Sequence, residues 1–367
     1  MPLDPNLDYY EGVRHLPGSY LVLETTNRCS VACVHCSVGE ASADGKGHPH
    51  HDRTGFVTVP LVRKLFADLR AAEARFDVFI PFWLGEPLLH PDFSTIYQEA
   101  LRAAGEHRSF ERIEVHTNAT HLTPERVRLA LNQSTVPQTW HLTLDATTPE
   151  TWRKIKGRLI FDDVVANVEH LVAEKARLAA PWPRLVFQFI VSDRNATEAA
   201  DFRTKWEGVC RRAKLPVRTA AQDVPTGTDA VVYFRQLDAP TVAEQERQNT
   251  VFRETMAAMG VPLPRPAQSP EHIDGAPGVC GCFWKSPVIG WDGSLTTCTR
   301  DNRLENKLGS IVDASFGELW YGAQVTGWRR QVAKGEYAGL SACNGCFIPR
   351  SSNYSGVTPA EIAQALP

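Results

Sequence analysis

The sequence lacks the features that mark a membrane, secreted or nucleic-acid-binding protein. No apolar run approaches the roughly 20 residues that a membrane-spanning helix needs. The first residues are acidic and polar, unlike a secretory signal. Lysine and arginine total 39 against 42 aspartates and glutamates, a formal charge of −3, so there is no excess of positive charge for a nucleic acid. We therefore expect a soluble, cytoplasmic protein without nucleic-acid or membrane partners.

Cysteine is the residue type that stands out. The chain has nine cysteines in 367 residues, and an odd number without a secretory signal argues against a disulfide framework. Eight of them are grouped, within residues 29–36, at 280 and 282, at 298, and at 343 and 346, and only Cys210 is isolated. Closely spaced thiols in a reducing compartment are more often metal ligands than disulfides.

Strand and helix patterns alternate along the first 223 residues. Apolar, β-branched runs are followed by segments of helical periodicity. The predicted strands are residues 19–26, 76–85, 111–120, 139–146, 184–192 and 215–223, and the predicted helices are 59–73, 93–105, 123–132, 148–157 and 195–213. About six such units predict an α/β fold, a partial (β/α)6 barrel of the TIM type, whose chemistry lies at the C-terminal ends of the strands.

The remaining segments suggest a small second domain. Residues 224–279 contain one short strand pattern, one helix pattern and a loop rich in proline and glycine, which we interpret as a linker. The expected parts are an N-terminal extension (1–17), the barrel (18–223), the linker (224–279), a cysteine-rich domain (280–350) and a C-terminal tail (351–367).

The first cysteine group has the spacing CxxxCxxC. Cys29, Cys33 and Cys36 follow the first predicted strand in one loop. Three thiolates can hold three irons of a [4Fe–4S] cluster and leave the fourth iron open for another ligand. A closed zinc site is the alternative, with a fourth ligand from His35 or from the run His48, His50 and His51. We prefer the cluster, because a loop at a strand end suits a catalytic cofactor.

Later strand ends extend this pattern. Leu84-Gly85-Glu86-Pro87 resembles the GGEP element of radical S-adenosylmethionine (SAM) enzymes, and Thr117-Asn118-Ala119-Thr120 resembles their TNGT motif. The resemblance covers roughly residues 18–220. It implies a cluster that cleaves SAM to a 5′-deoxyadenosyl radical. The residues that it implies as SAM contacts are Gly85, Glu86, Pro87, Asn118, Asp145 and Arg153, with Asn195 and Glu198 near the adenine.

The second cysteine group resembles the SPASM or twitch extension of that superfamily. The simplest ligand set for one auxiliary [4Fe–4S] cluster is Cys282, Cys298, Cys343 and Cys346, and Cys280 competes with Cys282 for the first position. The alternative is a structural zinc site of four cysteines in a binding protein. Behind a radical SAM barrel, we favour the iron–sulfur cluster.

An auxiliary cluster suits an oxidation, because it can accept an electron from a substrate radical. The chain resembles the cyclitol and sugar dehydrogenases of aminoglycoside antibiotic biosynthesis, which implies oxidation of a hydroxyl-bearing carbon to a ketone in a small, hydroxyl-rich substrate. A flavodoxin- or ferredoxin-type protein is the expected electron donor. An epimerase with a cysteine hydrogen donor and a peptide-modifying enzyme are the alternatives.

Catalytic side chains are sought on one face of the predicted strands, because residues two apart share a face. Glu114 and His116 share the face of Asn118, and His141 shares that of Asp145. These three, with Arg235 as a further candidate base and Cys280 as a possible hydrogen donor, are our candidate catalytic residues. We expect Cys210 to be packed in the core.

Overall fold

The computed structural model describes residues 18–36, 54–132, 134–239, 241–263, 280–344 and 346. Seven parallel strands form the barrel part. They are β1 (Gly18–Leu23), β2 (Phe76–Ile80), β3 (Phe110–Thr117), β4 (Gln138–Thr143), β5 (Arg184–Val191), β6 (Val217–Ala221) and β7 (Ala230–Gln236). The helices between them are α3 (Val59–Ala71), α4 (Phe93–Gly105), α5 (Pro124–Ala130), α6 (Pro149–Lys156), α7 (Phe161–Arg177) and α8 (Ala199–Arg212), and α9 (Val242–Ala258) follows β7.

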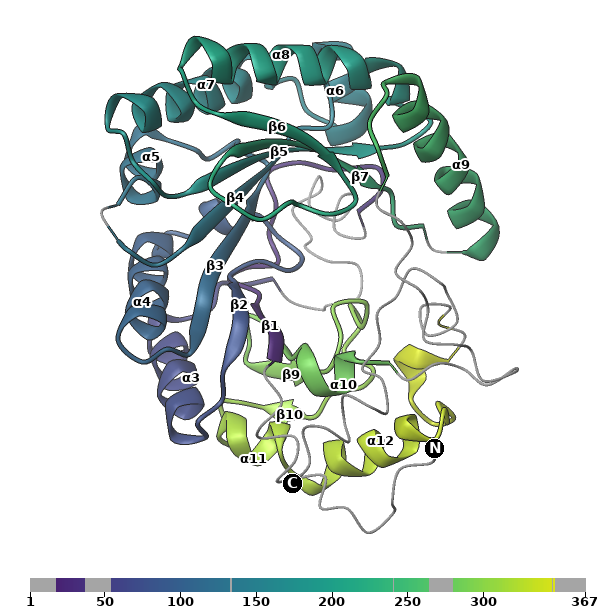
Figure 1. Ribbon diagram of the computed structural model, residues 1–367. Coiled ribbons are helices and arrows are strands. Elements are labelled where there is room, and N and C mark those ends of the chain that lie inside the picture. The colour runs from purple at the N-terminus through teal and green to yellow at the C-terminus, as the bar shows by residue number, and fades with distance from the viewer. Residues whose placement is uncertain are drawn as a thin grey trace.

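The sheet curves into an open, partial barrel with its helices on the outer face (Figure 1). Buried apolar side chains fill the layer between strands and helices, among them Ile113 and Val115 on β3 and Leu142 on β4. The predicted α/β partial barrel is confirmed. Across the described residues, no helix combines the length and the apolar character needed to cross a membrane.

The end of the barrel differs from the prediction. We expected residues 215–223 to close the strand series and the linker to begin at 224. Instead β7, with Val231 and Val232 fully buried, lies between β5 and β6 in the sheet. Helix α9 then packs against β5 and β7. The linker interpretation was wrong for this segment, because a strand can pair out of chain order. Helix α7 was not among the predicted elements.

The cysteine-rich domain continues the same sheet beyond β1. Strand β8 (Val288–Ile289) pairs in parallel with β1, and β9 (Ser294–Thr296) and β10 (Gly309–Ser310) follow as antiparallel neighbours. The helices of this domain are α10 (Cys282–Lys285), α11 (Phe316–Trp320) and α12 (Ala323–Ala333). Asp68 on α3 accepts the backbone N–H of Phe316 at 3.0 Å. The domain is therefore joined to the barrel by both sheet pairing and helix contact.

Helix α6 contacts the loop that carries the first three cysteines. Its N-cap Thr148 accepts a hydrogen bond from the Thr151 N–H, and Pro149 occupies the first turn, where no intrahelical donor is needed. The helix ends at Gly157, which has a φ of 69° in the left-handed region that favours glycine. These local signals fix the ends of a short helix that carries residues of the site.

Candidate active site

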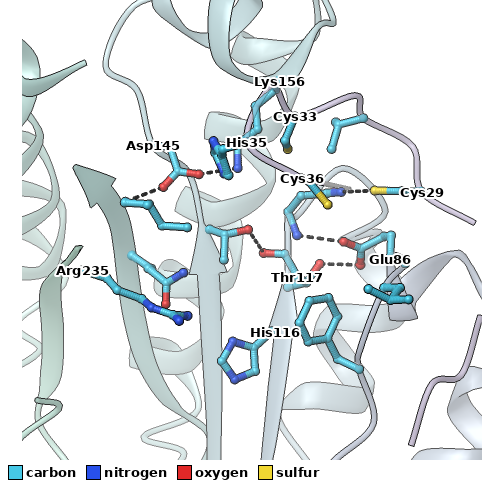
Figure 2. Close-up of a pocket in the computed structure, with 18 of the residues that line it drawn as sticks. Cys29, Cys33, His35, Cys36, Glu86, His116, Thr117, Asp145, Lys156 and Arg235 are labelled. Atoms are coloured by element: carbon cyan, nitrogen blue, oxygen red, sulfur yellow. Dashed lines mark hydrogen bonds and ion pairs between the residues drawn. The ribbon is translucent and has the colours of Figure 1, made fainter. Parts of the chain in front are cut away.

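The three cysteines of the first loop line one cavity of about 360 Å³ at the C-terminal ends of the strands (Figure 2). The end of α6 holds this loop, because the carbonyls of Lys156 and Ile155 accept the N–H groups of Ala32 at 2.8 Å and Val34 at 3.0 Å. Burial raises the pKa of the Cys33 thiol to about 11. Three thiols that line one cavity form a suitable ligand set for the open cluster.

The end of β2 packs tightly on the same loop. A Cβ atom on Gly85 would lie 2.1 Å from the Thr26 carbonyl oxygen, so only glycine fits there. The next residue, Glu86, donates its backbone N–H to the Arg28 carbonyl at 2.8 Å. Gly85 and Glu86 line the cavity, whereas Pro87 is buried at the start of a short 3-10 helix and is not part of the lining.

Glu86 is fully enclosed. It accepts hydrogen bonds from the Thr117 hydroxyl at 2.6 Å and from the Asn118 N–H at 2.8 Å. Burial raises its pKa to about 7, although these hydrogen bonds favour the charged form. The Asn118 side chain extends to the cysteine loop, with Nδ2 at 3.5 Å from Cys29 Sγ. The two predicted motifs thus meet around one carboxyl group.

Asp145 and Lys156 form a buried ion pair in the cavity wall (Figure 2). Asp145 also accepts the Ile190 N–H at 2.7 Å, which fixes its carboxylate. Burial opposes the charge of Lys156, but Asp145 and the nearby cysteines hold the lysine pKa above its usual range. Arg153, which we expected at SAM, is exposed on α6 and is not part of the lining. Lys156, one helical turn further on, is the cation that α6 contributes to the cavity wall.

A polar trio lies inside the barrel next to this cavity. The Nε2 atoms of His116 and His141 are each 3.0 Å from Glu114 Oε1, and the two imidazoles stack with their centroids 4.3 Å apart. His116 lines the cavity, but Glu114 and His141 lie behind it. Burial would raise the pKa of Glu114, yet the hydrogen bonds from both histidines hold it well below its usual range. Burial lowers the pKa of His116 to about 4.

A second cavity of about 710 Å³ adjoins the first and lies between the barrel and the cysteine-rich domain. His116 and Arg235 line both cavities, and the cysteine-rich domain contributes Arg300 and Asn302 to the larger one. Arg235 is paired with Asp238 at 2.8 Å. A molecule in this space would contact both domains.

Five cysteines converge in the second domain. Cys282 hydrogen-bonds to Cys280 and Cys298, and the Asn306 amide donates to Cys343 Sγ at 3.3 Å. Cys346 donates its N–H to the Cys343 carbonyl at 3.1 Å. Four thiolates match the ligand set of an auxiliary [4Fe–4S] cluster, and Cys280 and Cys282 are alternative first ligands.

Other candidates lie elsewhere. Asn195 and Glu198 are outside the linings of both cavities; they hold the loop after β4, since Asn195 donates to the Asp145 carbonyl and Glu198 accepts from Thr147 and Thr148. Cys210 is fully buried in the core, as expected. The alternative zinc ligands at 48, 50 and 51 lie outside the described residues.

Comparisons with known proteins agree with this arrangement. Residues 23–177 match the model of the Radical SAM superfamily, and residues 280–347 match that of the SPASM iron-sulfur cluster-binding domain. No curated protein matches the chain. The predicted cofactors, SAM with SAM-binding and auxiliary [4Fe–4S] clusters, are confirmed at this level.

Solved structures resemble this chain at low sequence identity. SuiB of Streptococcus suis bound to S-adenosylmethionine is 14% identical, with a TM-score of 0.55 over 85% of this chain and 68% of that chain. His-tagged anSMEcpe with bound AdoMet is 15% identical, with a TM-score of 0.56 over 95% and 94%. BtrN in complex with AdoMet and 2-DOIA is 14% identical, with a TM-score of 0.47 over 89% and 91%.

Proposed function

Because the chain is a radical SAM enzyme with a SPASM-type iron–sulfur domain, we propose that it oxidises a hydroxyl-bearing carbon of a sugar or aminocyclitol intermediate to a ketone. The observation that carries this proposal is the placement of the Glu114–His116–His141 trio. His116 lines both cavities, the smaller one together with the three cysteines of the first loop and the larger one together with residues of the cysteine-rich domain. A proton acceptor is thus available where a substrate would contact both domains.

The oxidation removes a hydrogen atom, a proton and an electron from the substrate. When bound, SAM and its cluster supply the radical that takes the hydrogen atom from carbon, and the auxiliary cluster accepts the electron. The remaining task for the protein is to accept the hydroxyl proton and to hold the substrate carbon near the cysteine loop.

His116 is suited to accept that proton. Its low pKa keeps the imidazole neutral at pH 7. With Nε2 donating to Glu114, its Nδ1 is left as a hydrogen-bond acceptor. The Glu114 carboxylate would then stabilise the imidazolium that forms. Arg235, which lines both cavities, would bind the substrate oxygen.

On the cofactor side, we assign SAM contacts to Gly85, Glu86, Asn118 and Asp145, which all line the smaller cavity. Lys156 takes the place that we first gave to Arg153, because it is the cation in the same wall. Arg153 is exposed on α6 and does not line that cavity. A flavodoxin- or ferredoxin-type protein remains our proposed source of the initiating electron.

The epimerase alternative needs a thiol that faces the substrate. Among the described residues, the cysteines that line the two cavities are Cys29, Cys33 and Cys36, which belong to the SAM cluster. Cys280 is buried with the auxiliary cysteines and lines neither cavity. This arrangement favours dehydrogenation over return of a hydrogen atom.

Peptide modification is the second candidate, and the larger cavity favours it. Its volume of about 710 Å³ lies within the usual range of about 300–1,000 Å³ for ligand sites, large enough for several amino-acid residues. The same trio would then accept a proton from a peptide group. Short peptides are therefore included among the test substrates.

The test uses the anaerobically reconstituted protein with SAM, a reductant and panels of deuterated cyclitols, sugars and short peptides. We expect deuterium in 5′-deoxyadenosine and one ketone per SAM consumed. His116→Gln should lower ketone formation by about 100-fold, as for loss of a general base, and leave uncoupled SAM cleavage intact. His107→Gln, at an exposed histidine, is the control.

Two results would contradict the proposal. Solvent hydrogen at an inverted carbon, without a ketone, would identify an epimerase. A modified peptide with no reaction of any cyclitol or sugar would select the second candidate.

A further inference from the structure

Arg329, on α12 in the cysteine-rich domain, is fully buried. Its Nε donates to the Phe283 carbonyl at 2.7 Å, and its guanidinium lies 4.9 Å from the centroid of the Trp320 ring. Both contacts are with groups of no net charge. The side chain is therefore held in a defined place inside the domain, not at its surface.

The guanidinium has no ionic partner among the described residues. Its two Nη atoms, both inaccessible to solvent, have no hydrogen-bond partner there. Burial lowers its pKa to about 9, so it still carries a positive charge at pH 7. An unpaired buried charge is strongly unfavourable. Something else in the folded protein must offset this cost.

The position of Arg329 indicates which group offsets the cost of this buried charge. Phe283, which accepts its hydrogen bond, directly follows Cys282 in α10, so Arg329 lies behind the backbone of an auxiliary-cluster cysteine. The donor set of this site is thiolate, and four thiolates around a [4Fe–4S] core leave about two negative charges in the same interior. We propose that Arg329 is the buried counter-charge of the auxiliary cluster.

This role has an electrostatic consequence. Reduction adds one more negative charge to the cluster, and a fixed cation in a low-dielectric interior favours the more negative form. Arg329 therefore raises the reduction potential of the auxiliary cluster and makes it a better electron acceptor. The inference concerns the cluster itself and holds for any substrate.

The first test compares midpoint potentials of the reconstituted full-length protein by EPR-monitored redox titration. Arg329→Met keeps the length of the side chain and removes the charge, Arg329→Lys keeps the charge, and Arg330→Met places the same change at an exposed neighbour. We expect a more negative auxiliary potential in Arg329→Met only. The SAM-binding cluster in the same sample should keep its potential in every variant. Equal auxiliary potentials in wild type and Arg329→Met would overturn the proposal.

The second test covers a variant that binds iron poorly. Thermal unfolding is measured for wild type and Arg329→Met, each with and without iron. If Arg329 is a counter-charge, the methionine raises the melting temperature of the iron-free protein and lowers that of the reconstituted protein. A purely structural arginine would give the same sign in both, and that result would overturn the proposal even if Arg329→Met held no auxiliary cluster.

Discussion

Gly85→Ala is the substitution whose effect the structure defines most sharply. The new Cβ would lie 2.1 Å from the Thr26 carbonyl oxygen and 2.6 Å from that of Arg28, and both atoms are backbone. Heavy atoms essentially never come within 3.0 Å of a Cβ, so the cysteine loop and the end of β2 must separate by about 1 Å. Overpacking of this kind costs about 1–3 kcal/mol of stability.

The displacement matters more for catalysis than for folding. A shift of about 1 Å in a reacting group commonly costs about 100-fold in rate. We therefore expect reductive SAM cleavage in Gly85→Ala to fall by about that factor, while the auxiliary cluster keeps its EPR signal. The assay is 5′-deoxyadenosine formation with dithionite as reductant. Gly327→Ala, where nothing lies within 4 Å of the new Cβ, should instead stabilise α12 by about 0.5–1 kcal/mol. Full SAM cleavage by Gly85→Ala would refute the close-approach argument.

Three further predictions address other parts of the molecule. Lys156→Met should remove the ionic partner of Asp145, cost about 3–5 kcal/mol in urea unfolding and raise the KM for SAM. Arg153→Met should change neither the stability nor the KM. Equal effects of the two substitutions would contradict the assignment of the SAM contact to Lys156. Burial raises the pKa of Glu24 from 4.5 to about 8, so the folded state holds its proton more tightly than the unfolded state. Stability should therefore fall as pH rises from about 4.5 to 8, and Glu24→Gln should flatten that slope in unfolding midpoints measured at several pH values. The double variant Cys343→Ala/Cys346→Ala should retain about four of about eight irons per chain and still cleave SAM, and loss of all iron would show that the two centres depend on each other.

The cofactor loops could be predicted because their information is local. Cysteine spacing, the glycine before Glu86 and the TNAT run are short motifs at strand ends, and each strand end brings its motif to the same edge of a parallel sheet. Caps such as Thr148 and Gly157 likewise fix α6 from residues close in sequence.

The errors came where a side chain's role depends on neighbours distant in sequence. Arg153 and Lys156 are three residues apart on α6, and only the packing of the helix on the cysteine loop decides which one is buried. Strand β7 lies between β5 and β6, an order that no local pattern encodes.

The sequence by itself determined the two cysteine centres, the parallel alternation and the cofactor class, since these depend on spacing and periodicity. Only the tertiary structure decided that the imidazoles of His116 and His141 both contact the Glu114 carboxylate. In the part of the chain that the structure describes, it also decided that Arg329 is buried without an ionic partner. The physical reason is that burial and pairing depend on which helices and strands pack together. Strand register and helix packing determine this over the whole chain.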